Sequence, residues 1–258
     1  MQKYGLIGKS LDHSWSKDYF QQKFKREKIN NCIYENFPLG DLIGFRNLVL
    51  DDTELSGLNI TNPYKLEIIP YLDDLDPAAE AIQAVNCLQI SRRGNSVHII
   101  GYNTDMPAFR DTLIPLFHKF LRKALVLGTG GAARAVCHAL KELNIDYSVV
   151  SRQEKEGHLN YARIDGPIIA DHMLIINATP VGMLPNMGDC PPLPYSLLTS
   201  YHLLYDLVYN PEETLFLKNG KLAGARIKNG LEMLQMQAEL SWRIWNSLRL
   251  PLSAQPQW

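Results

Sequence analysis

The stretch "KALVLGTGGAARAVCHAL", residues 123–140, constrains the fold more than any other part of the chain. An unbroken apolar run leads into a glycine-rich turn of the form GxGxxA, Gly128 to Ala133, and then into residues with helical spacing. Glycines permit a tight turn and let the backbone approach a pyrophosphate, whose charge is stabilised by the helix N-terminus. A second apolar run at 146–151 completes a strand–helix–strand unit. These features predict a dinucleotide-binding domain.

The end of the second strand indicates which dinucleotide fits. NAD enzymes place an Asp or Glu there for the ribose 2′-hydroxyl, whereas a 2′-phosphate is matched by an Arg. Ser151 and Arg152 occupy this place, and no acid does. Glu154 and Glu156, close behind, would oppose a phosphate, and Lys155 would offset them. We therefore predict NADP rather than NAD.

The residues before this domain alternate between strand and helix signals of their own. Strands separated by helices imply mostly parallel pairing, and the apolar runs 85–90 and 96–103 predict one hairpin. We predict an α/β chain with a mostly parallel substrate domain at 1–105, completed by a C-terminal helix at 231–258. A doubly wound, Rossmann-type domain is predicted at 106–230.

Three further segments give local predictions. Residues 105–121 are predicted to form a helix that kinks or breaks at Pro115. Residues 180–194 contain five prolines and predict a long loop. The C-terminal helix has one apolar stripe with three- and four-residue spacing, made of Leu231, Leu234, Ala238, Trp242 and Trp245. At that spacing the two tryptophans are predicted to be core residues.

Composition excludes several partners. The chain is 46% apolar and 21% charged with a formal net charge of −1, so it lacks the basic excess that nucleic-acid binding requires. No apolar run approaches the roughly 18 to 20 residues of a membrane span, and the N-terminus resembles no signal peptide. We expect a cytoplasmic monomer or homodimer. The scattered cysteines predict single buried thiols and no metal site; they are Cys32, Cys87, Cys137 and Cys190.

The segment "NITNPYK", residues 59–65, places a lysine where a strand is expected to lead into a helix. Thr61 or Asn62 suits an N-cap and Pro63 suits the first helical position, so Lys65 is predicted in the first helical turn. A cation there faces the positive end of the helix dipole, which costs a few tenths to about 1 kcal/mol. The ordinary interpretation of Lys65 is a solvated surface lysine.

A dinucleotide-dependent hydride transfer needs a group that takes the hydroxyl proton and gives it back. A lysine can do this when burial and a helix N-terminus favour its neutral form. Asp105, at the predicted end of a strand in "GYNTD", is the best candidate for a carboxylate that orients the amine. Its alternative role is a helix N-cap, which spacing alone does not exclude.

Motifs in order along nearly the whole chain resemble those of the shikimate dehydrogenase family. "GLIGKSLDHSWSK" resembles G-x-P-I-x-H-S-x-S-P, "NITNPYK" resembles N-V-T-x-P-x-K, "AVNC" resembles G-A-V-N-T, and "GYNTD" resembles G-x-N-T-D. "GTGGAARAV" resembles the cofactor loop, "SRQ" stands where N-R-T is usual, and "NATPVGM" resembles N-A-T-S-x-G-M. "YDLVYNPEETLFL" and "NGLEMLQMQA" are similar to the closing segments.

The resemblance implies an NADPH-dependent, reversible reduction of 3-dehydroshikimate to shikimate, on the chorismate route to aromatic amino acids. It implies that the first domain folds with the C-terminal helix and that the active site lies in the cleft between the domains. Lys65 and Asp105 would form the catalytic pair at the reacting C3 oxygen.

The resemblance also assigns binding residues. Those implied for the substrate are Ser14, Ser16 and Tyr209 at the carboxylate, and Asn59, Thr61, Asn86 and Gln237 at or near the ring hydroxyls. Those implied for NADP are Gly128, Thr129, Gly130, Gly131, Ala132, Ser151, Arg152, Thr179, Leu207 and Gly230. A structural hydrogen bond is the favoured role of His13. A site of neutral polar groups suits a small polyhydroxylated acid, because an analogue lacking a hydroxyl would leave buried polar groups unpaired.

The chain departs from the family pattern at a few positions. Lys17 replaces the usual Pro, Asn62 stands where an apolar residue is common, and Ala108 where a Gly is usual. Two alternatives stay open: a dehydrogenase that prefers quinate and NAD, and a non-catalytic shikimate-binding sensor. Rates with both acids and both cofactors separate the first alternative, and tight shikimate binding without NADP reduction would indicate the second.

Overall fold

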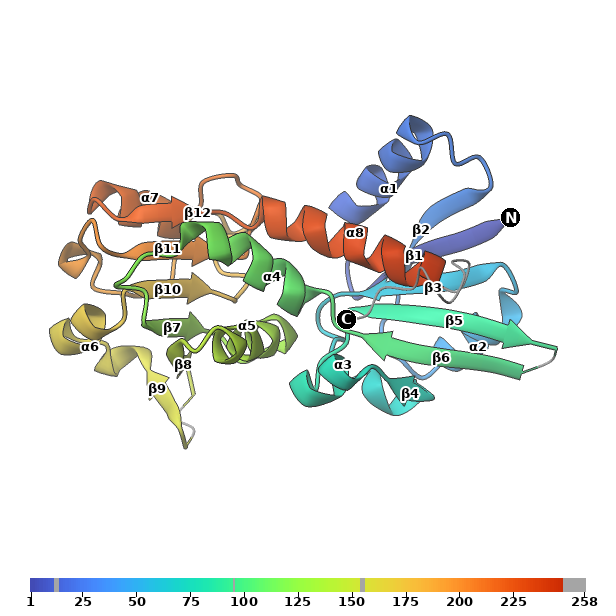
Figure 1. Ribbon diagram of the computed structural model, residues 1–258, viewed down its shortest axis with the longest axis horizontal. Coiled ribbons are helices and arrows are strands. Elements are labelled where there is room, and N and C mark those ends of the chain that lie inside the picture. Colours follow the sequence, from blue (N-terminus) through green and yellow to red (C-terminus); the bar gives the residue numbers. More distant parts are fainter. Residues whose placement is uncertain (12–13, 95, 154–155, 248–258) are drawn as a thin grey trace. The chain divides into compact units, whose positions relative to one another are not determined.

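A computed structural model describes the chain except for residues 12–13, 95, 154–155 and 248–258 (Figure 1). It divides into two compact units. Unit 1 comprises Met1–Thr104 with Ala238–Trp258, and unit 2 comprises Asp105–Gln237. The long helix α8, Leu231–Ser247, is divided between them after Gln237, seven residues beyond the division predicted at 230.

Unit 1 contains a six-stranded sheet in the order β2-β1-β3-β5-β6-β4. Its strands are β1 Gln2–Gly8, β2 Cys32–Pro38, β3 Leu55–Ile60, β4 Asp74–Leu75, β5 Cys87–Arg93 and β6 Ser96–Tyr102. Strand β1 pairs in parallel with β2 and β3, whereas β5 is antiparallel to β3 and β6. The predicted hairpin is therefore confirmed, while the two-residue strand β4 was not anticipated.

Helices cover both faces of this sheet. They are α1 Trp15–Arg26, α2 Phe45–Asp51, α3 Pro77–Ile82 and the last ten residues of α8, with a 3₁₀ turn at Ile69–Tyr71. Along β3, Leu58 and Ile60 point into a core with α2, and Gly57 and Asn59 face α8, as the period of two requires.

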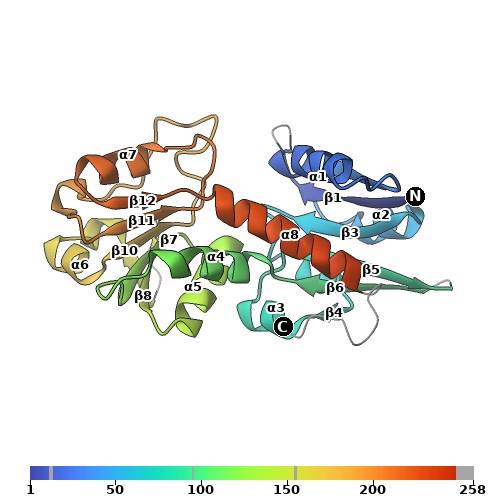
Figure 2. The same ribbon diagram turned by 45° about the horizontal axis from the view of Figure 1, so that its top comes forward.

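The second core of unit 1 is aromatic and includes both predicted tryptophans. Trp245 stacks on Tyr4 with ring centroids 4.7 Å apart, and its indole N–H donates to the Leu88 carbonyl at 2.9 Å. Trp242 packs at the edge of the same cluster. A Cβ on Gly57 would lie 2.3 Å from Trp245 Nε1, so glycine lets α8 approach the sheet (Figure 2). The prediction of core tryptophans is confirmed for Trp245, whereas Trp242 is half-buried.

The prediction that a helix begins near Thr61 is wrong. Residues 62–68 form turns, and the following helical element is the three-residue 3₁₀ turn. The Lys65 carbonyl accepts a hydrogen bond from the Val85 N–H at 2.8 Å, a partner twenty residues away in the sequence. Because this tertiary bond replaces a helical one, the helix dipole invoked above does not act on the Lys65 ammonium group.

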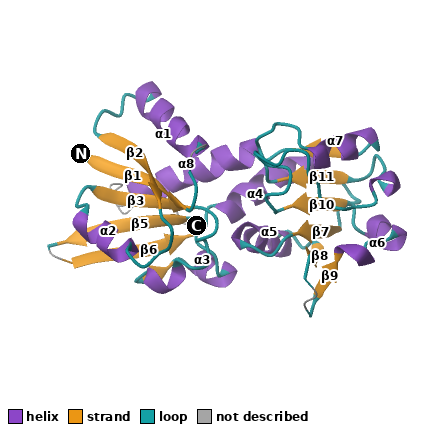
Figure 3. Cartoon of the chain, turned by 180° about the vertical axis from the view of Figure 1, so that it is seen from behind, coloured by secondary structure: helices purple, strands orange, loops and turns teal. Residues whose placement is uncertain are grey.

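Unit 2 is a doubly wound α/β unit with a parallel sheet in the order β12-β11-β10-β7-β8-β9, which confirms the predicted fold class (Figure 3). Its strands are β7 Lys123–Leu127, β8 Asp146–Ser151, β9 His158–Asn160, β10 Leu174–Asn177, β11 Leu203–Asp206 and β12 Arg226–Lys228. Its helices are α4 Asp105–Leu113, α5 Gly131–Glu142, α6 Gly166–Asp171, α7 Leu215–Leu222 and the start of α8. Three-residue 3₁₀ turns lie at Ile114–Leu116, Tyr161–Arg163 and Tyr195–Leu197.

Strand order reverses between β7 and β10, and ligands of such folds bind at the carboxyl edge of this point. Two local predictions are confirmed here. The helix α4 ends two residues before Pro115, which confirms the break, although residues 117–121, predicted to be helical, are not. Residues 180–194 contain neither helix nor strand. The three-residue strands β9 and β12 lacked a recognisable apolar run.

All four thiols are free, but burial differs from the expectation. Cys32 and Cys87 are buried, whereas Cys137 and Cys190 are half-buried. Desolvation raises the pKa of the Cys87 and Cys137 thiols to about 12. Over the part of the chain that is described, no helix has the length and apolar character needed to cross a membrane.

Candidate active site

A network of buried polar side chains lies at one edge of the unit 1 sheet. Asn59 is near the end of β3, Asn86 directly precedes β5, and Thr104 follows β6. Because β5 runs antiparallel to β3 and β6, the start of β5 lies beside the ends of β3 and β6, and the three residues share that end of the sheet. Their exposed fractions are 4%, 2% and 1%. Buried polar groups require partners, and these side chains satisfy one another.

Asn86 bonds Thr104 at two points. Its Nδ2 donates to Thr104 Oγ1 at 2.9 Å, and its Oδ1 accepts from the Thr104 backbone N–H at 2.6 Å. Thr104 directly precedes Asp105, and the neighbour of Asn86, Val85, bonds the Lys65 carbonyl. The amide thus fixes the backbone next to Asp105, and the backbone beside Asn86 holds that of Lys65.

Asn59 extends the network toward helices α1 and α8. Its Oδ1 accepts from the Tyr34 hydroxyl at 2.9 Å, and its Nδ2 donates to Ser241 Oγ at 2.8 Å. Ser16 hydrogen-bonds the Tyr34 hydroxyl, and burial raises the pKa of Tyr34 well above its ordinary value. Ser241 Oγ also lies 3.4 Å from Thr104 Oγ1. The structure therefore joins the predicted residues Ser16, Asn59 and Asn86 in one network.

Ser14 provides a hydroxyl of a different kind. It is the N-cap residue of α1, but its side chain makes no capping hydrogen bond. Within the described part of the chain, its buried Oγ has no hydrogen-bond partner. A buried hydroxyl at the N-terminus of a twelve-residue helix is suited to an anionic ligand. His13, beside it, lies outside the described residues.

Thr61 lies close to the same loop of unit 1. Its backbone N–H donates to the Ile7 carbonyl at 2.9 Å, at the end of β1. A Cβ on Gly8 would lie 2.6 Å from Thr61 Cγ2, so the glycine makes room for this side chain. The half-buried Thr61 is thereby fixed beside the segment that leads to Ser14.

The expected reacting residues stand in different units. Lys65 is half-buried in the turn after β3, and Asp105, 5% exposed, is the first residue of α4. Since α4 begins at Asp105 itself, its carboxylate is inside the first turn rather than at the preceding N-cap position. Tyr209 and Gln237 belong to unit 2, where burial raises the pKa of Tyr209 and Gln237 Nε2 donates to the Leu234 carbonyl.

The glycine turn of unit 2 meets the requirements of a dinucleotide site. Gly128 has φ +115°, and its Cβ would lie 3.0 Å from Thr179 Cγ2, so a side chain would be strained there. Gly130 is the N-cap of α5 without a side-chain hydrogen bond, and its Cβ position faces open space. Thr129 is exposed, Gly131 begins α5, and Ala132 follows in its first turn. Uncapped N–H groups beside open space fit a bound pyrophosphate.

The remaining cofactor residues follow the strands. Thr179 lies two residues after β10 and Leu207 one after β11, and the Leu207 N–H donates to the Asn177 carbonyl at 3.0 Å. Gly230 precedes α8, where a Cβ would come 2.2 Å from the Leu207 carbonyl oxygen. These residues lie beside the switch point of the sheet, where a dinucleotide is expected.

The turn after β8 carries the residues predicted to select NADP. Ser151 Oγ accepts from the Gln153 N–H at 3.2 Å, which forms a local turn. The Arg152 carbonyl accepts from Asn160 Nδ2 at 3.2 Å, so β9 holds its backbone while the side chain is exposed. Glu156 is exposed as well, and Glu154 and Lys155 lie outside the described residues.

Comparison with known proteins identifies the family to which the chain belongs. Residues 6–88 match the family described as the shikimate dehydrogenase substrate binding domain. An NADP(+) shikimate dehydrogenase of Desulforamulus reducens is 32% identical over 269 residues, which cover 96% of this chain and 91% of that protein. The chain belongs to the shikimate dehydrogenase family. The resemblance stated from the motifs is confirmed.

Solved shikimate dehydrogenases share the fold. The enzyme termed shikimate dehydrogenase 1 of Peptoclostridium difficile superposes with a TM-score of 0.83 at 33% identity, over 98% of this chain and 94% of that one. The Thermus thermophilus enzyme, solved in complex with NADP(H) and shikimate, gives 0.81 at 29% identity, over 100% and 95%.

Three members of the unit 1 network were missed by sequence reasoning. Thr104 lies within the quoted "GYNTD" and could have been found there. Ser241 is a polar residue between Ala238 and Trp245 on the apolar face of α8, a signal that was available. Tyr34 follows the alternation of β2 like any core tyrosine, so nothing in the sequence distinguished its hydroxyl.

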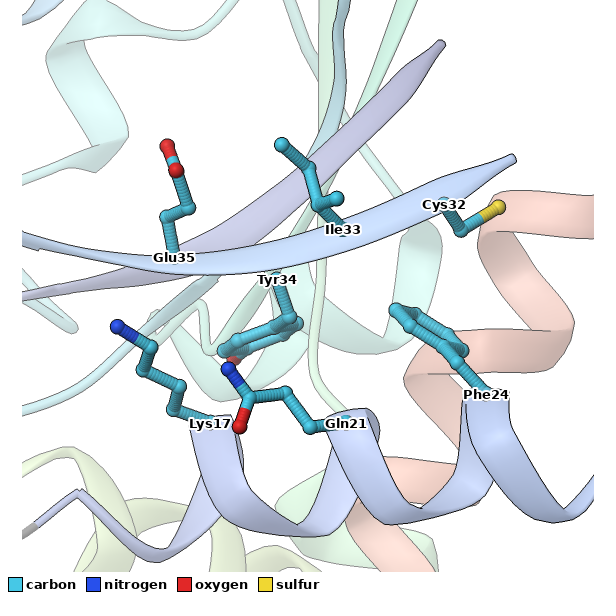
Figure 4. A pocket seen from close by; sticks show the side chains of 7 residues that line it. All are labelled: Lys17, Gln21, Phe24, Cys32, Ile33, Tyr34 and Glu35. Atoms are coloured by element: carbon cyan, nitrogen blue, oxygen red, sulfur yellow. The ribbon is translucent and has the colours of Figure 1, made fainter. Parts of the chain in front are cut away.

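A hollow of about 300 Å³ between α1 and β2 has none of the predicted site residues in its lining (Figure 4). The side chains of Lys17, Gln21 and Phe24 extend from α1 toward β2, whereas those of Ile33 and Glu35, on β2, point away from α1. The Tyr34 ring lines it too, although its hydroxyl is committed to Asn59. Over the described residues, no cluster of three or more His, Cys, Asp or Glu side chains could hold a metal ion.

Proposed function

We propose that this chain catalyses the reversible, NADP-dependent interconversion of shikimate and 3-dehydroshikimate. The observation that carries the proposal is the buried, uncharged network that links Ser16, Asn59, Asn86 and Thr104. Thr104 directly precedes Asp105, and Val85, which precedes Asn86, bonds the Lys65 carbonyl. Amides and hydroxyls in fixed orientations suit a small acid with several hydroxyl groups, and membership of the family supports that substrate.

Substrate recognition divides between a carboxylate end and a hydroxyl end. Ser14 and Ser16, at the N-terminus of α1, bind the carboxylate together with Tyr209. Thr61, Asn86 and Gln237 act at the ring hydroxyls, by direct contact or by positioning the groups that make it. Asn59 has both ends of its amide engaged by Tyr34 and Ser241, and this favours a positioning role.

Proton transfer rests on Lys65 and Asp105. In shikimate oxidation the Lys65 amine takes the proton of the C3 hydroxyl, and in the reverse direction its ammonium returns that proton. The Asp105 carboxylate orients the amine and accepts a hydrogen bond from a neighbouring hydroxyl. The bonds from Thr104 to Asn86 and from Val85 to Lys65 restrain the backbone that carries both groups, which supports their positioning before substrate arrives.

NADP supplies the hydride acceptor or donor for this reaction. Gly128 to Ala132 would hold its pyrophosphate on the N-terminus of α5, and Ser151 and Arg152 its 2′-phosphate. Thr179, Leu207 and Gly230 would line the side of the dinucleotide that reaches the substrate. The positive φ of Gly128 and the open space at Gly130 support this placement.

A spectrophotometric assay tests the proposal. The purified chain is incubated with shikimate or quinate and with NADP+ or NAD+ in turn, and absorbance of the reduced nicotinamide is followed. We expect the highest kcat/KM with shikimate and NADP+. A preference for quinate with NAD+ would replace the proposal with the alternative substrate pair, and tight shikimate binding without reduction of either cofactor would indicate a sensor.

A further inference from the structure

Asp206 carries a fully buried carboxyl group that the proposed proton transfer does not use. It is the last residue of β11, with an exposed fraction of 0%. Burying a carboxylate is costly unless hydrogen bonds replace its lost hydration. The partners of this group therefore indicate why the cost is tolerated.

Three donors converge on the carboxyl group from three segments. Thr214 Oγ1 donates to Oδ2 at 2.5 Å, Asn177 Nδ2 donates to Oδ1 at 2.9 Å, and the Val208 N–H donates to Oδ1 at 3.0 Å. Asn177 ends β10, Val208 follows β11, and Thr214 is the N-cap of α7. The carboxyl group thus ties together segments at the carboxyl edge of the parallel sheet.

From Asn177 the connection continues to a predicted cofactor residue. Asn177 Oδ1 accepts from the Thr179 backbone N–H at 3.1 Å and from Thr179 Oγ1 at 2.6 Å. The Thr179 methyl group in turn limits the space at Gly128, the first residue of the glycine turn. On the other side, the Gly230 N–H donates to the Val208 carbonyl at 3.1 Å.

We propose that Asp206 is a positioning residue for the dinucleotide, holding the segments of Thr179, Leu207 and Gly230 in register with the glycine turn. The inference rests on the proposed function, because it takes these segments to contact NADP. Asp206 itself makes no contact with the cofactor in this role. Its effect reaches the ligand through Asn177 and through the backbone on either side of Val208.

The ionised form is the one that suits this role. All three partners are donors, so a carboxylate satisfies them together, whereas an amide or a protonated acid presents a donor to at least one of them. Thr214 Oγ1 already accepts the Leu217 N–H of α7, which limits how it can adapt. Burial raises the pKa of Asp206 to about 6, so the carboxylate predominates at pH 7.5 and is lost below that pKa.

The test measures binding rather than turnover. Calorimetric Kd values for NADP+ and for NAD+ are determined for the full-length wild type and Asp206→Asn at pH 7.5 and pH 5. We expect the variant to bind both dinucleotides roughly tenfold more weakly at pH 7.5, a factor that one reversed buried hydrogen bond can produce. At pH 5 the two proteins should converge. The Kd for NAD+ reports the pH dependence of the protein more directly than that for NADP+, because NAD+ lacks a 2′-phosphate that titrates in this range.

Two further variants keep the inference falsifiable. Thr112→Val removes another buried hydroxyl of unit 2, bonded to the Tyr205 hydroxyl at 2.8 Å, and should leave both Kd values within twofold. The exchanged pair Asn177→Asp with Asp206→Asn restores an amide-to-carboxylate bond but leaves the Val208 N–H facing an amide donor and removes the donor to the Val181 carbonyl. It should therefore recover part of the lost affinity. If Asp206→Asn fails to fold, this exchanged pair and the wild-type pH series for NAD+ carry the test.

Equal Kd values for the wild type and Asp206→Asn at pH 7.5 would overturn the inference. A loss of the same size at pH 5 would overturn it as well, because packing alone would then explain the effect. Failure of the proposed function is a separate result: the wild type would bind dinucleotide in the calorimeter yet fail to oxidise shikimate in the assay.

Discussion

Each unit places a buried polar network at the edge of its sheet, but the two networks differ in charge. The unit 1 network consists of amides and hydroxyls, contributed by Ser16, Tyr34, Asn59, Asn86, Thr104 and Ser241. The unit 2 network converges on the carboxyl group of Asp206, to which three donors point. Both networks hold neighbouring chain segments together by hydrogen bonds, but only the one built on a carboxyl group is expected to change its ionisation near neutral pH.

The pKa shifts of the buried groups differ in the same way. In unit 1, burial raises the pKa of Tyr34 and of the adjoining Cys87 thiol, the latter to about 12, so both stay protonated at neutral pH. In unit 2, burial raises the pKa of Asp206 to about 6, close to physiological pH. We therefore expect substrate positioning to be insensitive to moderate pH changes, whereas cofactor positioning is sensitive.

The largest expected effect comes from removing the reacting amine that the neutral network borders. Lys65→Ala should lower kcat for shikimate oxidation by roughly a thousandfold, since general acid–base catalysis contributes factors of this order. The KM for shikimate should change far less, because the polar side chains that bind the ring remain. Steady-state kinetics with saturating NADP+ measures both quantities.

Lys25→Ala is the matched control for this variant. Lys25 is an exposed lysine on α1, so its loss removes the same charge and should leave kcat within twofold. A Lys65→Ala protein with the turnover of the wild type would contradict the assignment of the catalytic amine. A change confined to KM would instead make Lys65 a binding residue.

The second prediction gives the neutral network a charge. Asn86→Asp keeps the acceptor for the Thr104 N–H but removes the donor to Thr104 Oγ1. A carboxylate buried in this network should lower the free energy of unfolding by about 4 kcal/mol at pH 8. Burial should raise the pKa of the new carboxyl, so stability is present at low pH and is lost as pH rises through that pKa.

Urea denaturation at pH 5 and pH 8 measures this effect. At pH 5 the protonated acid can donate to Thr104 Oγ1 again, and most of the stability should return. Asn86→Ala serves as the control, because it loses both hydrogen bonds to Thr104 without adding a charge and should be equally destabilised at both pH values. Equal behaviour of the two variants would show that the network tolerates a carboxylate, and the contrast with unit 2 would fail.

The fold followed from local patterns to a large extent. Apolar runs located the central strands of both sheets, and the GxGxxA turn located α5 within its strand–helix–strand unit. The error at Lys65 has a nonlocal cause, since the bond from Val85 to the Lys65 carbonyl takes the backbone out of the helical pattern. The N-cap candidates Thr61 and Asn62, with Pro63 after them, favoured a helix locally. The hydrogen bond from Val85, a residue distant in the sequence, nevertheless determines the conformation.

The site was predictable in its residue types but not in its connections. Asn59 and Asn86 could be named from motifs, whereas the bond from Asn59 to Ser241 joins positions 182 residues apart. Nothing in a strand pattern shows that the hydroxyl of Tyr34 reaches an amide. Asp206 was likewise part of a quoted motif, but its role depends on Asn177 and Thr214, which only the folded sheet brings to it.

The third prediction removes the acid from the unit 2 network. The folded-state pKa of Asp206, about 6, lies above the ordinary value of 3.8, so the folded chain favours the protonated form. The resulting stability is fully present below about pH 4 and is lost as pH rises through 6. Relative to Asp206→Asn, the wild type should lose about 3 kcal/mol over this range. Parallel urea-midpoint series from pH 4 to 7.5 measure the difference, and parallel curves would contradict the raised pKa.

The smallest expected effect comes from Arg152, an exposed charge, and its pattern should differ from that of the buried positioning residue Asp206. Arg152 is exposed and its backbone is held by Asn160, so Arg152→Ala should remove an ion pair with the 2′-phosphate without disturbing the turn. Exposed ion pairs are worth about 1 kcal/mol, and the KM for NADP+ should rise five- to tenfold, roughly, while that for NAD+ stays within twofold. Arg163→Ala, an exposed arginine of the same unit, controls for net charge. Because Asp206→Asn is expected to weaken both dinucleotides alike, equal losses of NADP+ and NAD+ affinity in Arg152→Ala would mean that Arg152 also acts by positioning.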